Sequence, residues 1–307
     1  MKKIKPKSVR FIKLGQKGQW EPDCIEGKNP CIRLGFINPH HAECLKGNWD
    51  ALRAHWAEKK TKGKTTEITN QIKDFYTLDQ DTLWITFYRL RLYWCFAYPG
   101  VELLEDGTRS RRVVGKWNSK SNTGEELLIE NLSGKLTKTK GFRGTICSVG
   151  EEEYLIRRIN GEIAPVVLNA KQCLSSLEKS LEELIRSLGW KDFELLCDLI
   201  FTHSGWQRVS AVGGTEKSID LDLLSPVSGK RAFVQIKSQA DTKTFKEYCE
   251  TFATLDQYDE MFFVVHTALG DISTWEIPDK TQILSIEKIS RLAVAAGLSK
   301  WIIQKNA

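Results

Sequence analysis

Four polar residues on two predicted strands form the group best suited to chemistry. Asp220 and Asp222 belong to one strand, Gln235 and Lys237 belong to the next, and the turn-rich segment 225–230 joins them as a β-hairpin. Side chains two residues apart in a strand share a face, so these four polar groups gather on one side. Oxygen ligands and a cation in this arrangement can hold a hard divalent metal beside a water molecule.

The opposite side of the hairpin is apolar, and Phe233 shares the polar side. A solvent-exposed hairpin face, on which an aspartate pairs with Lys237, would give the same pattern. Under the metal hypothesis we favour Asp220 as the carboxylate ligand and keep Asp222 as the alternative.

The residues before the hairpin add a specific context. The chain reads Phe193-Glu194 on a predicted helix, then Ser204-Gly205-Trp206, Gly213-Gly214-Thr215, the aspartates and Gln-Ile-Lys at 235–237. Over roughly residues 171–303 this order resembles the Mrr-type branch of the PD-(D/E)xK nuclease superfamily, in which Gln replaces the second acid.

The resemblance implies roles for five residues in a phosphodiester hydrolase. Asp220 would hold a Mg²⁺ or Mn²⁺ ion, with oxygens from Gln235 and the Ile236 main-chain carbonyl. Glu194 would reach the metal directly or through water, and Lys237 would lie beside the attacking water. Because Gln carries no charge, the site is expected to hold one metal ion.

Composition limits the class of protein. The 307 residues are 41% hydrophobic and 27% charged, and the formal charge of +6 suits a polyanionic partner without requiring one. The eight cysteines form no CxxC pair, which favours free thiols in a reducing compartment. The basic N-terminus lacks a following apolar core, and no apolar run is long enough to span a membrane, so we expect a cytoplasmic protein.

The pattern of elements predicts two α/β domains. The C-terminal half alternates helices (169–188, 191–203, 242–255, 287–296) with strands (208–212, 219–224, 231–238, 261–266, 282–286), which predicts a restriction-endonuclease-like mixed sheet flanked by helices. The N-terminal half has predicted strands at 8–14, 31–36, 82–88, 92–97, 112–117, 145–149 and 154–158, and helices at 48–60 and 67–75. We place domains at 1–150 and 171–307, with a linker at 151–170.

The N-terminal half also resembles a known superfamily. The hairpin formed by 79–87 and 92–97 is similar to the central hairpin of PUA-like barrels, the superfamily of EVE, YTH, ASCH and SRA domains. This implies a small α/β barrel that reads nucleic acid, with a modified or flipped base in an aromatic pocket.

Aromatic and basic residues of the N-terminal half supply candidates for that contact. Trp49 and Trp117 stand beside predicted loops and are favoured for the base pocket; Trp20, Trp84 and Trp94 complete the set, although tryptophans of small barrels mostly form the core. Candidate contacts to the DNA backbone come from three basic runs: Lys62, Lys64, Arg111, Arg112, Lys138 and Arg143. Zinc at Cys24, Cys31 and Cys44 with His40 and His41 is disfavoured by spacing.

Together these patterns predict a Mg²⁺-dependent endonuclease that acts on double-stranded DNA and depends on base modification, as in restriction enzymes that fuse a PUA-like reader to a nuclease. Two alternatives remain: a sequence- or structure-specific nuclease, and a non-catalytic nucleic-acid-binding protein; RNA is also an open substrate. Cutting both strands requires two active sites, so a homodimer is plausible, with the leucine-rich helix 169–188 as a candidate contact.

Overall fold

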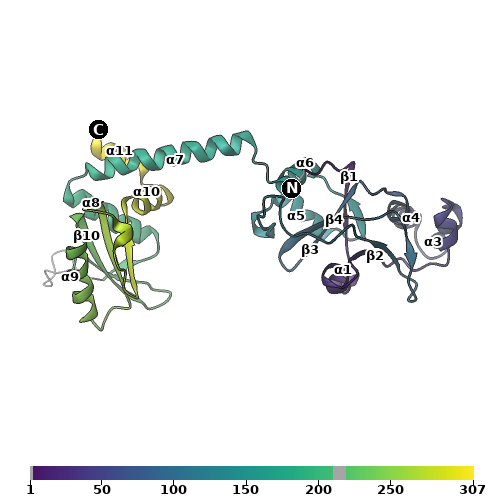
Figure 1. Ribbon diagram of the computed structural model, residues 1–307, viewed down its shortest axis with the longest axis horizontal. Helices are drawn as coiled ribbons and strands as arrows, with labels where there is room; N and C mark the ends of the chain where they lie inside the picture. Colours follow the sequence, from purple (N-terminus) through teal and green to yellow (C-terminus); the bar gives the residue numbers. More distant parts are fainter. Residues whose placement is uncertain (1–2, 210–218) are drawn as a thin grey trace. The chain divides into compact units, whose positions relative to one another are not determined.

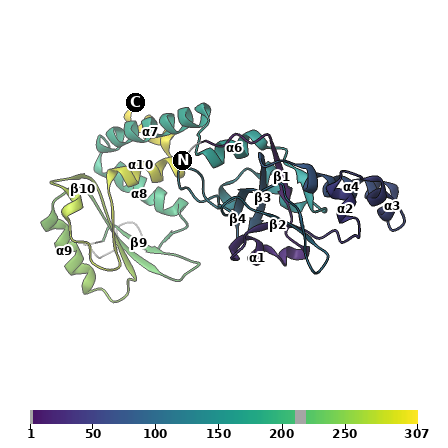
Figure 2. The same cartoon turned by 45° about the vertical axis from the view of Figure 1, so that its right-hand side comes forward.

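A computed structural model describes residues 3–209 and 219–307. The chain divides into two compact units, unit 1 (Met1–Ala164) and unit 2 (Pro165–Ala307). Figure 1 and Figure 2 label their elements. Across the described part of the chain, no helix is both long and apolar enough to cross a membrane.

Unit 1 contains two small sheets. The four-stranded sheet has the order β4-β3-β1-β7, formed by Arg91–Phe96, Thr82–Tyr88, Ser8–Ile12 and Ile146–Ser148. In it β1 runs parallel to β3, whereas the other pairs are antiparallel. The three-stranded sheet is antiparallel with the order β2-β6-β5, formed by Cys31–Leu34, Arg109–Arg112 and Glu102–Leu103.

Short helices surround these sheets. They are α1 (Glu21–Glu26), α2 (His41–Leu45), α3 (Asp50–Ala57), α4 (Lys62–Thr77), α5 (Gly134–Thr137) and α6 (Glu152–Asn160). The longest, α4, buries Ile68, Ile72 and Phe75 at helical spacing against the core that also holds Trp84. Unit 1 is therefore α/β; the PUA-like barrel stays a prediction.

Two predicted strands of unit 1 are wrong. Residues 113–117 do not continue a strand, because β6 ends at Arg112 and only isolated bridges follow, such as Ala97 with Val113. Residues 154–158 lie in α6, where Leu155 and Ile159 are buried four residues apart and Gly161 ends the helix in a left-handed conformation at φ 68°. Much of segment 151–170, which we expected to be a linker, is thus helical.

Unit 2 contains one mixed sheet, as predicted, and its strand order is β12-β11-β10-β9-β8. Its strands are Thr281–Leu284, Glu260–Ala268, Arg231–Ala240, Leu221–Leu224 and Gln207–Arg208. The helices are α7 (Pro165–Arg186), α8 (Trp190–His203), α9 (Thr242–Ala253), α10 (Ile286–Ala295) and α11 (Ser299–Asn306). β10 runs parallel to β11 and antiparallel to β9. The predicted strand 208–212 extends beyond Val209, and the Gly213-Gly214-Thr215 step lies entirely outside the described residues.

Helices cover both faces of this sheet. On one face, Val234 and Ile236 pack with residues of α7, α8 and α10. On the other, Phe233 packs with Phe245 of α9 and with Trp275. Figure 1 shows α9 apart from α8 and α10, with β10 between them.

This arrangement corrects one expectation. We placed Phe233 and Gln235 on the polar side of the hairpin, yet on this side Phe233 is fully buried and Gln235 is only 2% exposed. β10 is a central strand covered on both sides, so its polar residues are surrounded by protein.

Candidate active site

The predicted hairpin places Asp220 beside Gln235. β9 pairs with β10 through Leu221 and Val234, and Asp220 directly precedes this pair. The amide Nε2 of Gln235 donates a hydrogen bond to Oδ2 of Asp220, and the main-chain N–H of Ile236 donates to the same oxygen at 2.6 Å. Both donors use Oδ2, which leaves Oδ1 for another partner.

Asp222 has a different partner. Its Oδ2 accepts a hydrogen bond from the Arg231 guanidinium at 2.6 Å, across the same hairpin. This ion pair neutralises the carboxylate. Asp220, which has no ion-pair partner within the described part of the chain, is therefore the better placed of the two for a metal.

Burial of the Asp220 carboxylate is the main reason that its pKa is raised above the ordinary value of 3.8. The hydrogen bond from Ile236, the charge of Lys237 and the hydrogen bond from Gln235 act in the opposite direction. Lys237 follows Gln235 by two residues and therefore shares its face of β10. Its ammonium also lies 5.1 Å from the ring centroid of Tyr248 on α9, a cation–π contact that holds the side chain.

Glu194 joins this group from α8. Burial raises the pKa of its carboxyl, and the negative charge of Asp220 raises it further, while Arg208 and Lys237 lower it. Two partly buried carboxylates that repel each other form an arrangement that a divalent cation stabilises.

Arg208 is a residue of this site that the sequence interpretation missed. It lies on β8, where Nη2 is 3.5 Å from the carbonyl oxygen of Asp220 and Nη1 is 3.6 Å from Oδ2 of Asp198 on α8. Its side chain remains 29% exposed. A charged residue in an edge strand carries little signal in a sequence, so only the fold reveals this second cation.

The donor atoms fit a hard metal ion. Gln235 Oε1 is buried and has no hydrogen-bond partner in the described chain, which is costly for an amide oxygen unless a ligand fills the position. Within the described residues no group of three His, Cys, Asp or Glu side chains could hold a metal. The proposed site contains only two such side chains, Asp220 and Glu194, because its other donors are an amide and a main-chain carbonyl. It therefore does not belong to the class of sites with three His, Cys, Asp or Glu ligands.

Three of the five tryptophans predicted for a base pocket in unit 1 are buried. Trp84 is fully buried; Trp94 and Trp117 are 8% and 5% exposed, and their indole N–H groups donate to the carbonyls of Lys120 and Cys31. These three rings belong to the core of the unit and offer no open face to a base. Trp49 precedes α3 and packs edge-to-face against Tyr76.

Trp20, in contrast, lines a cavity of about 630 Å³ with Phe36. The glycine backbones of Gly15 and Gly35 lie against the indole, because an added Cβ would come within 3.0 and 2.8 Å of its atoms. The Arg33 guanidinium lies 4.4 Å from the ring centroid. We call this cavity the Trp20 pocket.

The residues predicted to contact the DNA backbone differ in location and exposure. Arg143 lines the Trp20 pocket together with Lys13 and Lys17. The side chains of Lys62, Arg112 and Lys138 are exposed, and Lys64 is partly exposed in an ion pair with Glu67.

The prediction that Arg111 contacts the DNA backbone is wrong, because its side chain is fully buried. It donates hydrogen bonds to the carbonyls of Phe75, Ala97 and Tyr98, and burial lowers its pKa to about 10. It therefore has a structural role and cannot contact a phosphate.

The disfavoured zinc cluster does not form in the described chain. The sulfur atoms of Cys24 and Cys31 lie 3.6 Å apart. Cys44 lies on a different element, the helix α2. No metal-binding group of three such side chains is found in residues 3–209 or 219–307.

Comparisons with known proteins agree with the fold of unit 2. Residues 185–270 match the family model Mrr_cat, described as a restriction endonuclease. Unit 2 therefore contains a segment that matches a restriction-endonuclease domain of the Mrr type. Its matched segment includes every residue of the candidate active site. The search of curated proteins gives no match.

One solved structure is similar over a larger part of the chain. It is the MspJI restriction endonuclease in complex with a 27-mer oligonucleotide, with 13% sequence identity, a TM-score of 0.27, and coverage of 80% of this chain and 69% of that one.

Proposed function

We propose that the chain is a Mg²⁺-dependent endodeoxyribonuclease that hydrolyses phosphodiester bonds in double-stranded DNA and requires a modified base. The observation that carries the nuclease part is the hydrogen-bonded group of Asp220, Gln235 and Ile236, with Lys237 and Glu194 beside it. These are the donors and the cation that hydrolysis of a phosphodiester requires.

Four groups would hold the metal. They are the Oδ1 atom of Asp220, the Oε1 atom of Gln235, the main-chain carbonyl of Ile236, and Glu194 directly or through water. Mg²⁺ favours hard oxygen ligands and keeps several waters, which agrees with so few protein donors. When bound, the ion would polarise the scissile phosphate and lower the pKa of an attacking water.

The remaining residues position the reactants. Lys237, held by Tyr248, presents its ammonium to the attacking water or to the charge that develops on the phosphate oxygens. Arg208, partly exposed beside Asp220, would contact a neighbouring phosphate and partly neutralise Glu194. Glu194 must lose its proton before it can serve the metal, and both cations favour that loss.

For the modified base we propose the Trp20 pocket. Its indole offers a flat face, Asp106 and Thr108 offer hydrogen-bonding groups for a base edge, and Arg143 offers a phosphate contact. The carboxylate of Asp106 is oriented by the Thr108 hydroxyl, which donates to Oδ1 at 2.6 Å, and by an ion pair of Oδ2 with Arg33. Trp20 thus takes the role that we had assigned first to Trp49 and Trp117.

We also propose a homodimer formed through α7. This 22-residue helix exposes apolar side chains between Pro165 and Leu177, whereas Leu181 and Ile185 in its last turns are buried. A second copy would cover the exposed residues Val166, Val167, Leu168, Leu174 and Leu177. Pairing would also supply the second active site that cleavage of both strands requires.

The test is cleavage of unmodified, methylated and hydroxymethylated DNA, and of RNA, by the wild type, Lys237→Ala and Trp20→Ala. We expect Mg²⁺-dependent cleavage of modified DNA that Lys237→Ala abolishes and Trp20→Ala makes independent of modification or much weaker. Equal cleavage of all DNAs by the wild type would favour the sequence- or structure-specific nuclease. Binding without cleavage under Mg²⁺ and Mn²⁺ would favour the non-catalytic protein.

A further inference from the structure

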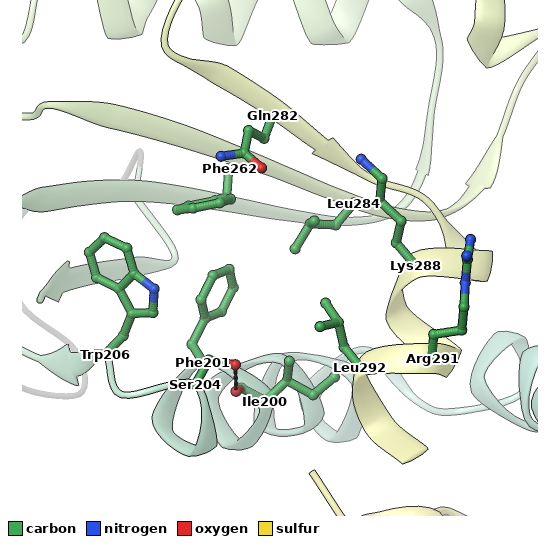
Figure 3. Close-up of a pocket in the computed structure, with 10 residues that line it drawn as sticks. All are labelled: Ile200, Phe201, Ser204, Trp206, Phe262, Gln282, Leu284, Lys288, Arg291 and Leu292. Atoms are coloured by element: carbon green, nitrogen blue, oxygen red, sulfur yellow. Dashed lines mark hydrogen bonds between the residues drawn. The ribbon is translucent and has the colours of Figure 1, made fainter. Parts of the chain in front are cut away.

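Unit 2 has a second cavity that the catalytic group does not use. It has a volume of about 440 Å³ and lies between the end of α8, the strands β11 and β12, and α10. Figure 3 shows three aromatic rings in it, those of Phe201, Trp206 and Phe262. Phe262 packs edge-to-face with the other two, at centroid distances of 5.1 Å to Phe201 and 5.8 Å to Trp206.

The polar lining of this cavity is positively charged. Besides Ser204, it is lined by Gln282, Lys288 and Arg291, and no Asp or Glu is among its described lining residues. Figure 3 shows the two cationic side chains at one end and the indole of Trp206 at the other. Lys288 Nζ donates to the carbonyl of Ile283 at 3.1 Å, and Arg291 Nε donates to that of Glu287 at 3.0 Å. Both bonds fix the direction of each side chain and leave donors on both groups.

The cavity is separate from the catalytic group. Phe262 and Leu284 belong to the core on the α8 side of the sheet, where Val234 also points. Gln235, the next residue of β10, points to the opposite face, as alternation in a strand requires. Glu194 lies near the start of α8, whereas Phe201 and Ser204 lie at its end. A ligand in this cavity would not occupy the metal site.

We propose that this cavity binds one nucleotide, with the base against the partly exposed indole of Trp206 and the phosphate at Lys288 and Arg291. An aromatic wall stacks with any base, because every base has a π-face. Cations at the opposite end match a phosphate, and Arg binds phosphate with a fork of donors. The cavity volume is within the range of small-molecule sites.

The two cations at one end of the cavity disfavour a purely apolar ligand. A leucine or phenylalanine side chain from another protein would bury the aromatic wall but would leave two cations beside it without a counter-ion, which is unfavourable. The amide of Gln282 is exposed and can donate to or accept from the polar edge of a base. A nucleotide satisfies the wall, the amide and the cations together. It can be free in solution or part of a strand.

The experiment measures equilibrium binding to the full chain without divalent metal, so that the catalytic site does not hold the ligand. The probes are the four ribonucleoside and deoxyribonucleoside monophosphates, the matching nucleosides, and a single-stranded oligonucleotide. We expect saturable binding of a monophosphate, at least ~10-fold weaker for its nucleoside, and weakened ~10-fold or more in Lys288→Ala/Arg291→Ala. Trp206→Ala should weaken monophosphate and nucleoside alike.

Two control variants decide the location. Lys300→Ala removes an exposed lysine of α11 outside the cavity and should not change nucleotide affinity, whereas Lys237→Ala removes the cation of the catalytic group and reports any phosphate that binds there instead. The thermal midpoint of each variant checks folding, and Trp206→Phe, which keeps an aromatic wall, should bind more tightly than Trp206→Ala.

The outcomes separate the two sources of the nucleotide. Binding of the oligonucleotide alone, sensitive to the cavity variants, would assign the site to a strand; binding of free monophosphates would assign it to a soluble ligand. No saturable binding of either, or binding that changes only in Lys237→Ala, would overturn the proposal. Neither result bears on the proposed cleavage reaction, which the cleavage assay tests.

Discussion

The carboxylate of Asp220 lies where the β9–β10 ladder ends. β9 starts at Leu221, so the next N–H of β10 on that side, that of Ile236, has no strand partner and donates to Asp220 instead. One carboxylate oxygen of Asp220 thereby accepts a hydrogen bond from a main-chain N–H of the central strand. The other oxygen faces the place where we propose the metal, so one side chain links the sheet to the chemistry.

Exchange of each hairpin aspartate for asparagine should separate their roles. Asp220→Asn removes the negative ligand and should lower the Mg²⁺-dependent cleavage rate by about 100-fold or more. Asp222→Asn breaks only the ion pair with the half-exposed Arg231, so it should cost about 1 kcal/mol or less of stability and leave cleavage within about threefold. Single-turnover cleavage and chemical denaturation measure the two effects; the reverse ranking of cleavage rates would make Asp222 the ligand.

Metal binding should depend on pH through Asp220 and Glu194, whose pKa values lie above their ordinary values of 3.8 and 4.5 because both are buried. In the metal-free protein, a carboxyl with a raised folded pKa stabilises the fold below its unfolded pKa. That contribution is lost as the pH rises through the folded pKa. Metal binding needs both groups ionised, so Mg²⁺ affinity should fall as the pH is lowered, with its midpoint above the ordinary carboxyl range.

Lys237 offers a control for this pH dependence, since its charge lowers the pKa of both carboxyls. Calorimetric titration of Mg²⁺ between about pH 5 and pH 8 should show a higher midpoint in Lys237→Ala than in the wild type. Lys300→Ala should leave the midpoint unchanged. A midpoint that Lys237→Ala does not move would place this ammonium away from the metal ligands.

At the scale of elements, β6 shows that a run of charged residues in a strand can have some of its side chains buried. Its sequence Arg109–Arg112 reads as a basic surface run, yet Arg109 and Arg111 share the inner face and are fully buried. Their guanidinium groups donate to carbonyls such as those of Phe36 and Phe75, and Arg109 also donates to the Tyr76 hydroxyl. Buried charges are retained when their donors are satisfied, and here dipoles replace a carboxylate partner.

Alanine variants of neighbouring arginines in β6 should therefore behave differently. Arg111→Ala leaves three carbonyls without a donor and an empty volume, so it should lower the free energy of unfolding by roughly 2–4 kcal/mol. Arg112→Ala, at an exposed position, should change stability by less than about 0.5 kcal/mol. If Arg112 contacts DNA, its loss should also reduce the salt dependence of binding by about one ion. Equal stability of the two variants would contradict the structural role of Arg111.

Much of unit 2 could be predicted from the sequence because its pattern is local. The helical spacing of Leu181 and Ile185, the apolar run of β11 and the turn after Leu224 identify elements without knowledge of their neighbours. The tertiary environment could not be read in the same way. Nothing in the residues of β10 says that α9 covers Phe233, and nothing near Arg208 says that its edge strand reaches Asp220.

The candidate site of unit 1 was harder to predict for the same reason. Tryptophan is both a core residue and a stacking surface, and Trp117 and Trp20 differ only in what surrounds them. The segment predicted as a strand, 154–158, has three apolar or aromatic residues followed by two arginines, and it is too short for its pattern to distinguish a strand from a helix. Long-range contacts decide such cases.

At the scale of the whole molecule, the proposed dimer makes two active sites act together. Leu174 and Leu177 on α7 are 47% and 36% exposed. Their joint exchange for glutamate should give a monomer in analytical ultracentrifugation, with nicking retained and double-strand cleavage reduced by about 10-fold or more. Leu269→Glu, which introduces the same charge at a position 54% exposed elsewhere in unit 2, serves as the control. A wild type that is monomeric at all concentrations, with full double-strand cleavage, would exclude this assembly.

The glycines beside Trp20 limit how the proposed base pocket can change in shape. A methyl group at Gly35 would meet the indole at 2.8 Å, and Gly15 has both a close approach and a φ of 88° that other residues rarely adopt. The main chain at Gly15 and Gly35 therefore fixes the width of the Trp20 pocket where it contacts the indole. Divergence toward a bulkier or smaller chemical mark would have to proceed through Ile37, Asp106 and Thr108 on the remaining walls.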